Sequence, residues 1–126
     1  MVENTRFYYC PICGNVIGLI EGDANHMTCC GKPMQLLEAN TTDAAQEKHV
    51  PVYERVEDEI AVKVGSVEHP MEKEHYITWV AQMTDNRTIR VRLYPEQATT
   101  VRFPYVKGAR LYAYCNKHGL WGTTVE

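Results

Sequence analysis

Hydrophobic and polar residues alternate with a period of two along most of the chain beyond residue 50. Successive side chains of a β-strand point to opposite faces of the sheet, so this alternation predicts strands that are buried on one face only. Seven such segments span residues 50–56, 60–66, 75–83, 88–96, 99–106, 109–116 and 119–126. Turn signals such as Asp-Asn at 85–86 and Lys-Gly at 107–108 separate them. No segment has a sustained helical period.

Seven short strands at this spacing predict an all-β fold with an immunoglobulin-like antiparallel β-sandwich. The N-terminal part of the chain follows another pattern, with the turn sequence CPICG at 10–14 and a single short strand at 16–20. The polar segment EANTTDAAQEK separates the two parts. We therefore predict a small metal-binding domain over residues 1–38 and a β-sandwich domain over residues 39–126.

Composition and charge narrow the classes of function. The chain has 126 residues, of which 44% are hydrophobic and 23% charged, as in soluble globular proteins. A net charge of -3 gives no basic field for nucleic acid, and no apolar run approaches the ~20 residues that cross a membrane. The start, MVENTRFYYC, lacks the apolar core of a secretory signal, so we expect a cytoplasmic protein. In that reducing compartment, clustered cysteines bind metal more often than they form disulfides.

Four of the five cysteines lie within the first 30 residues and predict a metal site there. They are Cys10, Cys13, Cys29 and Cys30. A unit of this size buries too little apolar surface to fold alone, and a metal held by four thiolates would supply the missing free energy. Zinc and iron both accept four thiolates. Adjacent cysteines can hardly reach one centre at ideal tetrahedral angles, which favours a distorted iron site and leaves zinc as the rival. His26 is expected on the surface, because four thiolates complete the shell.

A second candidate site combines the remaining cysteine with four histidines at strand ends and in loops. These residues are His49, His69, His75, Cys115 and His118. Loops at one end of a rigid sandwich are where such a site is built. Structural zinc closes at four ligands, whereas four imidazoles and one thiolate fit a square pyramid with an open sixth position, which points to iron. Cys115 would then be the axial ligand, whose thiolate pushes electron density onto whatever binds opposite.

These residues and their surroundings resemble a known family. The chain resembles desulfoferrodoxin, the two-iron superoxide reductase of anaerobic bacteria, over its whole length. The four-cysteine part resembles desulforedoxin, and the segments EKHVPVYE, EHPMEKEHYI and CNKHGLW resemble the catalytic domain. The resemblance implies two Fe ions per chain: a rubredoxin-like ferric centre on the four N-terminal cysteines, and a catalytic iron with four equatorial histidines and Cys115. It also implies a homodimer and a rubredoxin-type electron donor.

The resemblance further implies an activity, the one-electron reduction of superoxide to hydrogen peroxide in defence against oxygen stress. Two residues immediately before His49 are the candidate catalytic residues. Lys48 is expected to steer superoxide and to hold a water close to the reacting oxygen. Glu47 is expected to occupy the sixth position of ferric iron after peroxide leaves. Backbone amides of residues 116–118 are expected to donate hydrogen bonds to the Cys115 sulfur and tune the potential.

Three other functions remain open at this point. A pure electron carrier would use both irons without a substrate, but an open coordination position would serve no purpose there. A zinc-stabilised binding module would be colourless. A dismutase would share the substrate, and its peroxide yield per superoxide and its independence of a reductant would distinguish it.

Overall fold

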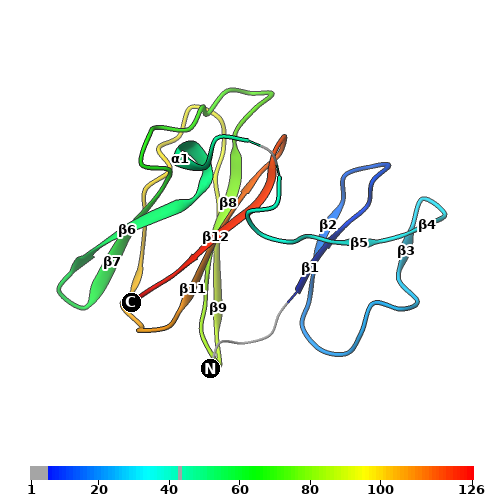
Figure 1. Cartoon of the computed structure of the whole chain (residues 1–126), viewed down its shortest axis with the longest axis horizontal. Helices are drawn as coiled ribbons and strands as arrows, with labels where there is room; N and C mark the ends of the chain where they lie inside the picture. The colour runs from blue at the N-terminus through cyan, green and yellow to red at the C-terminus, as the bar shows by residue number, and fades with distance from the viewer. Residues whose placement is uncertain (1–5, 43) are drawn as a thin grey trace. The chain divides into compact units, whose positions relative to one another are not determined.

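The computed structural model describes residues 6–42 and 44–126, which are almost entirely β-structure (Figure 1). Residues 1–5 of the predicted N-terminal domain and Asp43 of the predicted polar segment lie outside the described residues. The described part divides into two compact units, residues 6–38 and residues 39–126. The predicted fold class, a small four-cysteine unit followed by a separate β domain, is confirmed.

The smaller unit is built from two small antiparallel sheets. Its strands are β1 (Arg6–Tyr9), β2 (Val16–Leu19), β3 (Thr28–Cys29), β4 (Lys32–Pro33) and β5 (Gln35–Leu36). One sheet has the order β2-β1-β5, and β3 pairs with β4. Among the described residues of this unit only Phe7, Tyr8 and Cys10 are buried, which is a very small core.

The larger unit is a sandwich of two antiparallel sheets (Figure 1). The three-stranded sheet has the order β10-β7-β6, and the four-stranded sheet has the order β12-β11-β8-β9. The strands are β6 (Pro51–Val56), β7 (Glu59–Val64), β8 (Ile77–Met83), β9 (Thr88–Arg92), β10 (Val101–Pro104), β11 (Arg110–Cys115) and β12 (Gly119–Thr124). Each corresponds to one predicted segment, although several are shorter than predicted.

The core of the sandwich comes from the inward faces of both sheets. Its largest apolar cluster is made of residues with at most 1% of their surface exposed, namely Ile60, Val62, Val64, Ile77, Val80, Leu93, Phe103, Ala109, Leu111, Ala113, Cys115 and Val125. The alternation of buried Val62 and Val64 with the exposed Lys63 reproduces the pattern in the sequence. Cys115 is thus anchored in the rigid core rather than in a loop.

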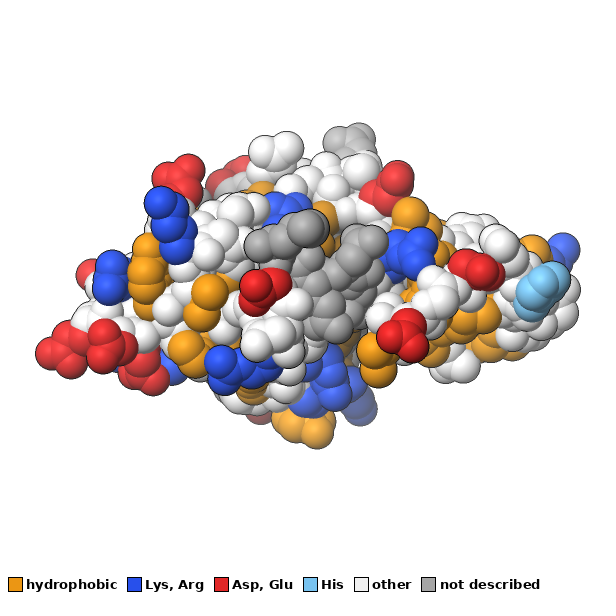
Figure 2. Space-filling view, turned by 90° about the horizontal axis from the view of Figure 1, so that it is seen from below, with side chains coloured by type: hydrophobic (Ala, Val, Ile, Leu, Met, Phe, Trp, Pro, Cys, Tyr) orange, Lys and Arg blue, Asp and Glu red, His pale blue; other side chains and the backbone are white. Residues whose placement is uncertain are grey.

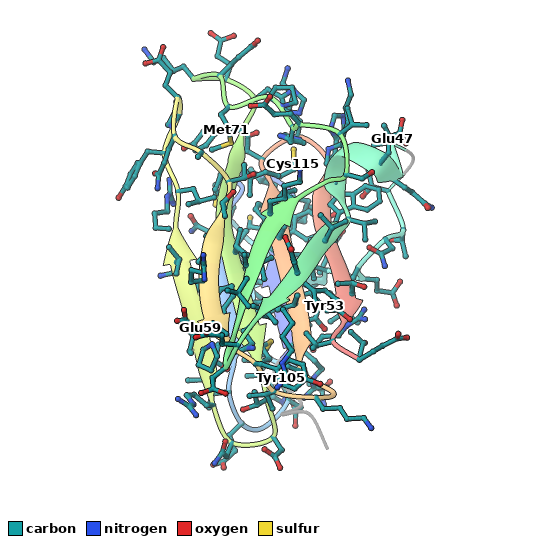
Figure 3. The ribbon with its side chains drawn as sticks, turned by 90° about the vertical axis from the view of Figure 1, so that its left-hand side faces the viewer. Glu47, Tyr53, Glu59, Met71, Tyr105 and Cys115 are labelled. Atoms are coloured by element: carbon teal, nitrogen blue, oxygen red, sulfur yellow. The ribbon has the colours of Figure 1, made fainter. Side chains whose placement is uncertain are left out.

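Charged side chains of both signs are interspersed on the face shown in Figure 2. The acidic side chains at the left end of that view belong to the turn between β6 and β7, where Glu57, Asp58 and Glu59 are exposed. Figure 3 places Glu59 at the opposite end of the sandwich from Cys115. The acidic turn is therefore remote from the cysteine that belongs to the second candidate site.

A single helical turn, α1 (Gln46–His49), precedes the first strand of the sandwich. The sequence did not predict this helix, because four residues are too few to show a period. The loop after β7 packs tightly against it: a Cβ on Gly65 would lie 2.5 Å from the Val67 carbonyl oxygen and 2.6 Å from that of Lys48. Gly65 also has a φ of 81°, which side-chain-bearing residues rarely adopt. This glycine fixes α1 against the loop that leads to His69.

Candidate metal centres

The second candidate site is assembled at one end of the sandwich from four separate segments. His49 ends α1, His69 and His75 lie between β7 and β8, Cys115 ends β11, and His118 lies in the β11–β12 turn. Figure 3 shows Cys115, Met71 and Glu47 at this end, with Glu59 and Tyr105 at the other. The fold brings the five predicted residues together, although His49 and His118, which are in contact, are 69 positions apart in the chain.

The four imidazole rings form a closed square. Neighbouring ring centroids are 4.6 Å apart for His49 and His69, 4.9 Å for His69 and His75, 5.0 Å for His75 and His118, and 4.9 Å for His118 and His49. Each ring is turned by 75° to 87° from the next. The four histidines follow one another around the square in the order of the chain, so His49 lies opposite His75.

Hydrogen bonds to backbone carbonyls fix which nitrogen of two of the histidines points into the square. The His49 Nδ1–H donates to the Ala45 carbonyl at 2.6 Å, and the His69 Nδ1–H donates to the Pro70 carbonyl at 2.6 Å. A carbonyl only accepts, so in a neutral ring the other nitrogen, Nε2, carries a lone pair. These bonds orient the rings in the way that metal-binding histidines are usually oriented.

In neutral rings the Nε2 atoms of His49 and His69 face each other without a proton between them, so a cation bound by both would relieve their repulsion. His49 Nε2 and His69 Nε2 are 3.0 Å apart, and His49 Nε2 and His118 Nδ1 are 3.1 Å apart. His75 Nε2 is buried and has no hydrogen-bond partner in the described part of the chain. Four donors spaced in this way around a square would each lie about 2.1 Å from its centre, a normal metal–nitrogen distance. The donor set therefore fits a metal ion.

Burial favours the neutral form of three of the histidines, which is the form that binds a metal. Desolvation lowers the pKa of His69 to about 4, helped by the neighbouring charges of His49 and His75. Desolvation also lowers the pKa of His49 and of His75. Protons consequently do not compete for these nitrogens near neutral pH.

Cys115 completes the group from within the core. Its sulfur lies 3.8 Å from His118 Nδ1 and within 4.8 Å of the ligand atoms of His49, His69 and His75. Burial raises the pKa of the Cys115 thiol, while the backbone amides of Lys117 and His118 act in the opposite direction by donating hydrogen bonds to the sulfur. Of the three amides expected to donate to the sulfur, those of Lys117 and His118 do so, whereas the Asn116 amide donates to the Tyr76 carbonyl. A bound cation would be needed to displace the thiol proton from so buried a position.

Two residues that sequence reasoning did not assign to the site support its ligands. Trp121 is fully buried, as expected of a core residue, but its ring also stacks on His49 at 4.8 Å and its indole N–H donates to the His118 carbonyl at 3.0 Å. Asn116 hydrogen-bonds to the backbone on either side of His75. Both lie inside the segment CNKHGLW, which was the only signal in the sequence that could have pointed to them.

Glu47 and Lys48 occupy α1 directly before His49, and both are exposed. The Glu47 carbonyl accepts hydrogen bonds from the Val67 amide at 2.8 Å and from the Ser66 hydroxyl at 3.4 Å. Their backbone is therefore held in place while their side chains stay in solvent. Burial is the main cause of the lowered pKa of His49; among the smaller causes, the charge of Lys48 lowers this pKa and the charge of Glu47 raises it.

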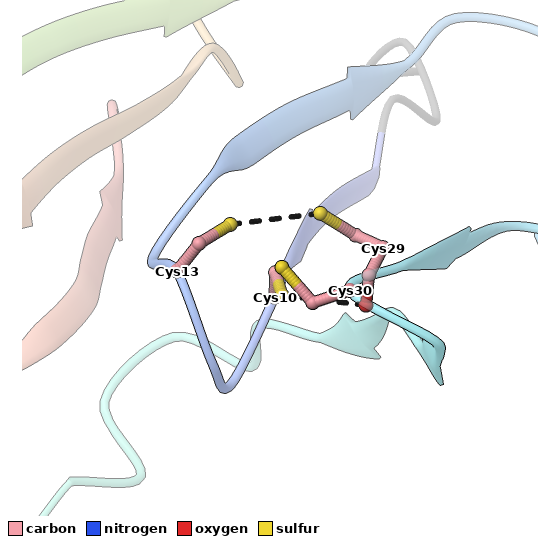
Figure 4. Close-up of side chains that lie close together, drawn as sticks. All are labelled: Cys10, Cys13, Cys29 and Cys30. Atoms are coloured by element: carbon pink, nitrogen blue, oxygen red, sulfur yellow. Dashed lines mark hydrogen bonds between the residues drawn. The ribbon is translucent and has the colours of Figure 1, made fainter.

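The first candidate site lies in the smaller unit, where the four cysteine sulfurs are within 4.8 Å of one another (Figure 4). The sulfurs of Cys13 and Cys29 are 3.5 Å apart, and all four thiols are free of disulfides. The adjacent Cys29 and Cys30 both reach the centre because Cys30 adopts a left-handed conformation, with φ at 52°, and Gly31 follows with φ at 72°. Backbone curvature thus solves the geometric difficulty that neighbouring ligands pose.

The pKa values of these thiols show that they cannot all ionise together unaided. Hydrogen bonds, chiefly from the backbone amide of Cys13, lower the pKa of Cys10 to about 6. Hydrogen bonds with Cys13 and Cys10 raise the pKa of Cys29, and similar bonds raise the pKa of Cys30 to about 12. One thiolate forms readily, and the others need a cation among them, which is what a four-thiolate metal site provides.

Comparisons with known proteins agree across both units. Residues 41–124 match the family Desulfoferrodoxin, and residues 2–37 match the family Desulfoferrodoxin, N-terminal domain. A desulfoferrodoxin of Syntrophotalea carbinolica is 46% identical over 124 residues, 98% of each chain. A desulfoferrodoxin homolog of Archaeoglobus fulgidus is 43% identical over 122 residues, 96% of this chain and 98% of the relative.

Among solved structures, the superoxide reductase from Treponema pallidum matches 96% of this chain and 99% of its own, with a TM-score of 0.75 and 33% identity. A superoxide reductase of Pyrococcus horikoshii is 33% identical over 100 residues, which are 64% of this chain and 87% of the relative. No helix in the described ranges is both long enough and apolar enough to cross a membrane.

Proposed function

Because the chain belongs to the desulfoferrodoxin family, we propose that it is a superoxide reductase that converts superoxide to hydrogen peroxide. In this reaction superoxide takes up one electron and two protons, and no dioxygen is released. The observation that carries the proposal is the square of four imidazoles above a buried cysteine, in which two lone-pair nitrogens lie 3.0 Å apart. This donor set suits a redox metal that tolerates more than four ligands.

In this proposal His49, His69, His75, His118 and Cys115 hold an iron ion. Ferrous iron, when bound, would supply the electron and one open coordination position. Burial favours the neutral, metal-binding form of His49, His69 and His75. Two backbone amides hydrogen-bond to the Cys115 sulfur and partly oppose the effect of its burial. These amides would share the negative charge of the thiolate and so tune the reduction potential.

Lys48 and Glu47 are proposed to serve the substrate and the product. The ammonium of Lys48 is exposed and one residue away from His49, so it would attract the superoxide anion and hold a water that donates a proton. The acidic β6–β7 turn lies at the far end of the sandwich, where ionic screening weakens its repulsion. The Glu47 carboxylate would bind in the position that peroxide vacates.

The smaller unit is proposed to bind a second, rubredoxin-like iron through Cys10, Cys13, Cys29 and Cys30. Four thiolates accept either zinc or iron, and the choice of iron rests on the family. The proposal extends to a rubredoxin-type electron donor, a homodimer and a cytoplasmic role in detoxification, all of which rest on the family.

The test is a metal assay with visible spectra before and after mild oxidation, followed by superoxide kinetics. We expect two irons per chain, a rubredoxin-like spectrum, and a new thiolate-to-iron absorption band on oxidation. With excess reductant, one peroxide should form for each superoxide consumed. A yield of one peroxide for two superoxides would indicate dismutation instead. Two irons without any reaction with superoxide would indicate an electron carrier, and two zincs without colour a structural module.

A further inference from the structure

Asn116 joins the turn that carries Cys115 and His118 to the segment that carries His75. Its backbone N–H donates to the Tyr76 carbonyl at 3.2 Å, and its side-chain oxygen accepts from the Tyr76 amide at 3.0 Å. Its side-chain NH2 donates to the Glu74 carbonyl at 3.0 Å. All three bonds end on the two residues that flank His75. One side chain thus holds the backbone on both sides of this histidine.

His75 depends on this support more than His49 and His69 do. The rings of His49 and His69 are each held by a carbonyl acceptor, whereas the buried Nε2 of His75 has no hydrogen-bond partner among residues 6–42 and 44–126. The segment that carries His75 lies outside the sheets. Within this segment, two backbone hydrogen bonds of 3.0 and 3.1 Å join His75 to Glu72. The direction of the His75 ring is therefore set mainly by its backbone.

We propose that Asn116 is a positioning residue that fixes His75 as the fourth nitrogen ligand of the metal. This inference rests on the proposed function, in which the four histidines and Cys115 bind iron. Asn116 does not touch the metal, and it acts by tying one ligand segment to the turn that supplies two other ligands. An asparagine suits this role because its amide both donates and accepts; aspartate would keep only the acceptor.

The chain contains a matched control for this role. Asn40 makes the same three kinds of bond to β12: its backbone N–H donates to the Leu120 carbonyl at 3.0 Å, its NH2 donates to the Gly122 carbonyl at 3.0 Å, and its side-chain oxygen accepts from the Gly122 amide at 2.9 Å. Neither Leu120 nor Gly122 is a proposed ligand, although both flank Trp121, which contacts His49 and His118. Asn40 also has a φ of 63°, so alanine there carries additional backbone strain. Asn40→Ala should thus cost at least as much stability as Asn116→Ala.

The experiment measures the rate at which the full-length, iron-loaded protein loses iron from the histidine–cysteine site to an excess ferrous chelator. Loss is followed through the thiolate-to-iron band after oxidation of samples, and the colour of the four-cysteine centre serves as an internal reference. Loss of a hydrogen bond that orients a ligand typically weakens metal binding by about tenfold to a hundredfold. We expect Asn116→Ala to release this iron faster by about that factor, Asn116→Asp to be intermediate, and Asn40→Ala, whose bonds act on the site only through Trp121, to accelerate release by a clearly smaller factor.

A double variant separates positioning from general loosening. In the His75→Ala background the ligand that Asn116 positions is absent, so adding Asn116→Ala should no longer accelerate iron loss. Equal release rates for Asn116→Ala and Asn40→Ala, or an undiminished effect of Asn116→Ala without His75, would overturn the inference alone. If Asn116→Ala does not fold, Asn116→Asp gives the same comparison. Wild-type protein that retains no metal at this site would overturn the proposed function, and this inference with it.

Discussion

Substitution of Trp121 by phenylalanine tests whether a core residue also shapes the histidine–cysteine site. The indole is fully buried, stacks on His49 with an angle of 24° between the planes, and donates its N–H to the His118 carbonyl. Phenylalanine retains an aromatic ring that can stack on His49. It removes the donor, so the Trp121→Phe variant isolates the hydrogen bond to a ligand residue.

The expected loss of stability has two parts. The partly buried His118 carbonyl loses its donor, which costs about 1–3 kcal/mol if no water replaces it. The smaller ring leaves a void on the order of 40 Å³, which adds about 1 kcal/mol at about 24 cal/mol per Å³. The total of about 2–4 kcal/mol is a large share of the ~5–15 kcal/mol that stabilises a typical domain. The His118 backbone should also move, which would change the absorption of the oxidised centre.

The assay is urea unfolding of the metal-free protein together with the visible spectrum of the oxidised, iron-loaded protein. Trp79→Phe is the matched control, because Trp79 is 6% exposed and stacks on Tyr114, which is not a proposed ligand. We expect both variants to lose stability and only Trp121→Phe to change the spectrum. An unchanged spectrum in Trp121→Phe, or an equal change in the control, would refute the reasoning.

Four further predictions follow from the geometry. Gly65→Ala should destabilise the protein by more than about 1 kcal/mol and lower its iron content, since the new Cβ would meet the Val67 and Lys48 carbonyls; unfolding curves and metal assays test this. Because the folded pKa of His69 is about 4 against 6.5 unfolded, the metal-free protein should lose up to about 3 kcal/mol as pH falls from 6.5 to 4, measured by urea unfolding at each pH. Lys48→Ala should react with superoxide more slowly and with less salt dependence at unchanged iron content, as pulse radiolysis would show, and an equal rate would remove the steering role. Glu47→Ala should keep the superoxide rate but alter the ferric spectrum, and an identical spectrum would exclude ligation.

The strands of the sandwich could be predicted because a half-buried sheet imposes alternation on the sequence. Their ends could not, and His75 shows why. The alternation extends to residue 75, but β8 begins at Ile77 because Asn116 takes both backbone bonds of Tyr76. This long-range contact replaces a sheet ladder and leaves His75 free to turn toward the other histidines. A local pattern carries no information about such a competitor.

The candidate ligands could be recognised from residue type, whereas their arrangement could not. Nothing in the sequence indicates that His49 faces His75 across the square, because the order depends on how α1, two loops and a hairpin meet in space. The adjacent cysteines illustrate a second limit. Their joint approach to one centre depends on the left-handed backbone of Cys30, a conformation that is uncommon outside glycine and that cysteine does not signal.

The two candidate centres relate to folding in opposite ways. In the smaller unit the only buried residues that the structure describes are Phe7, Tyr8 and Cys10, while Ile12, Ile20 and Leu36 are exposed. A core of this size supplies little stability. The free energy of binding a metal to the four thiols must therefore contribute much of the folding free energy of this unit. The sandwich has a large apolar core that orders Cys115 and the surrounding strands without a metal. That core in turn holds four imidazoles within contact distance of one another, and a cation bound among them would relieve the repulsion between their lone pairs. A metal at the first centre would therefore stabilise its fold, whereas the second centre is held together by its fold in a geometry that suits a metal ion.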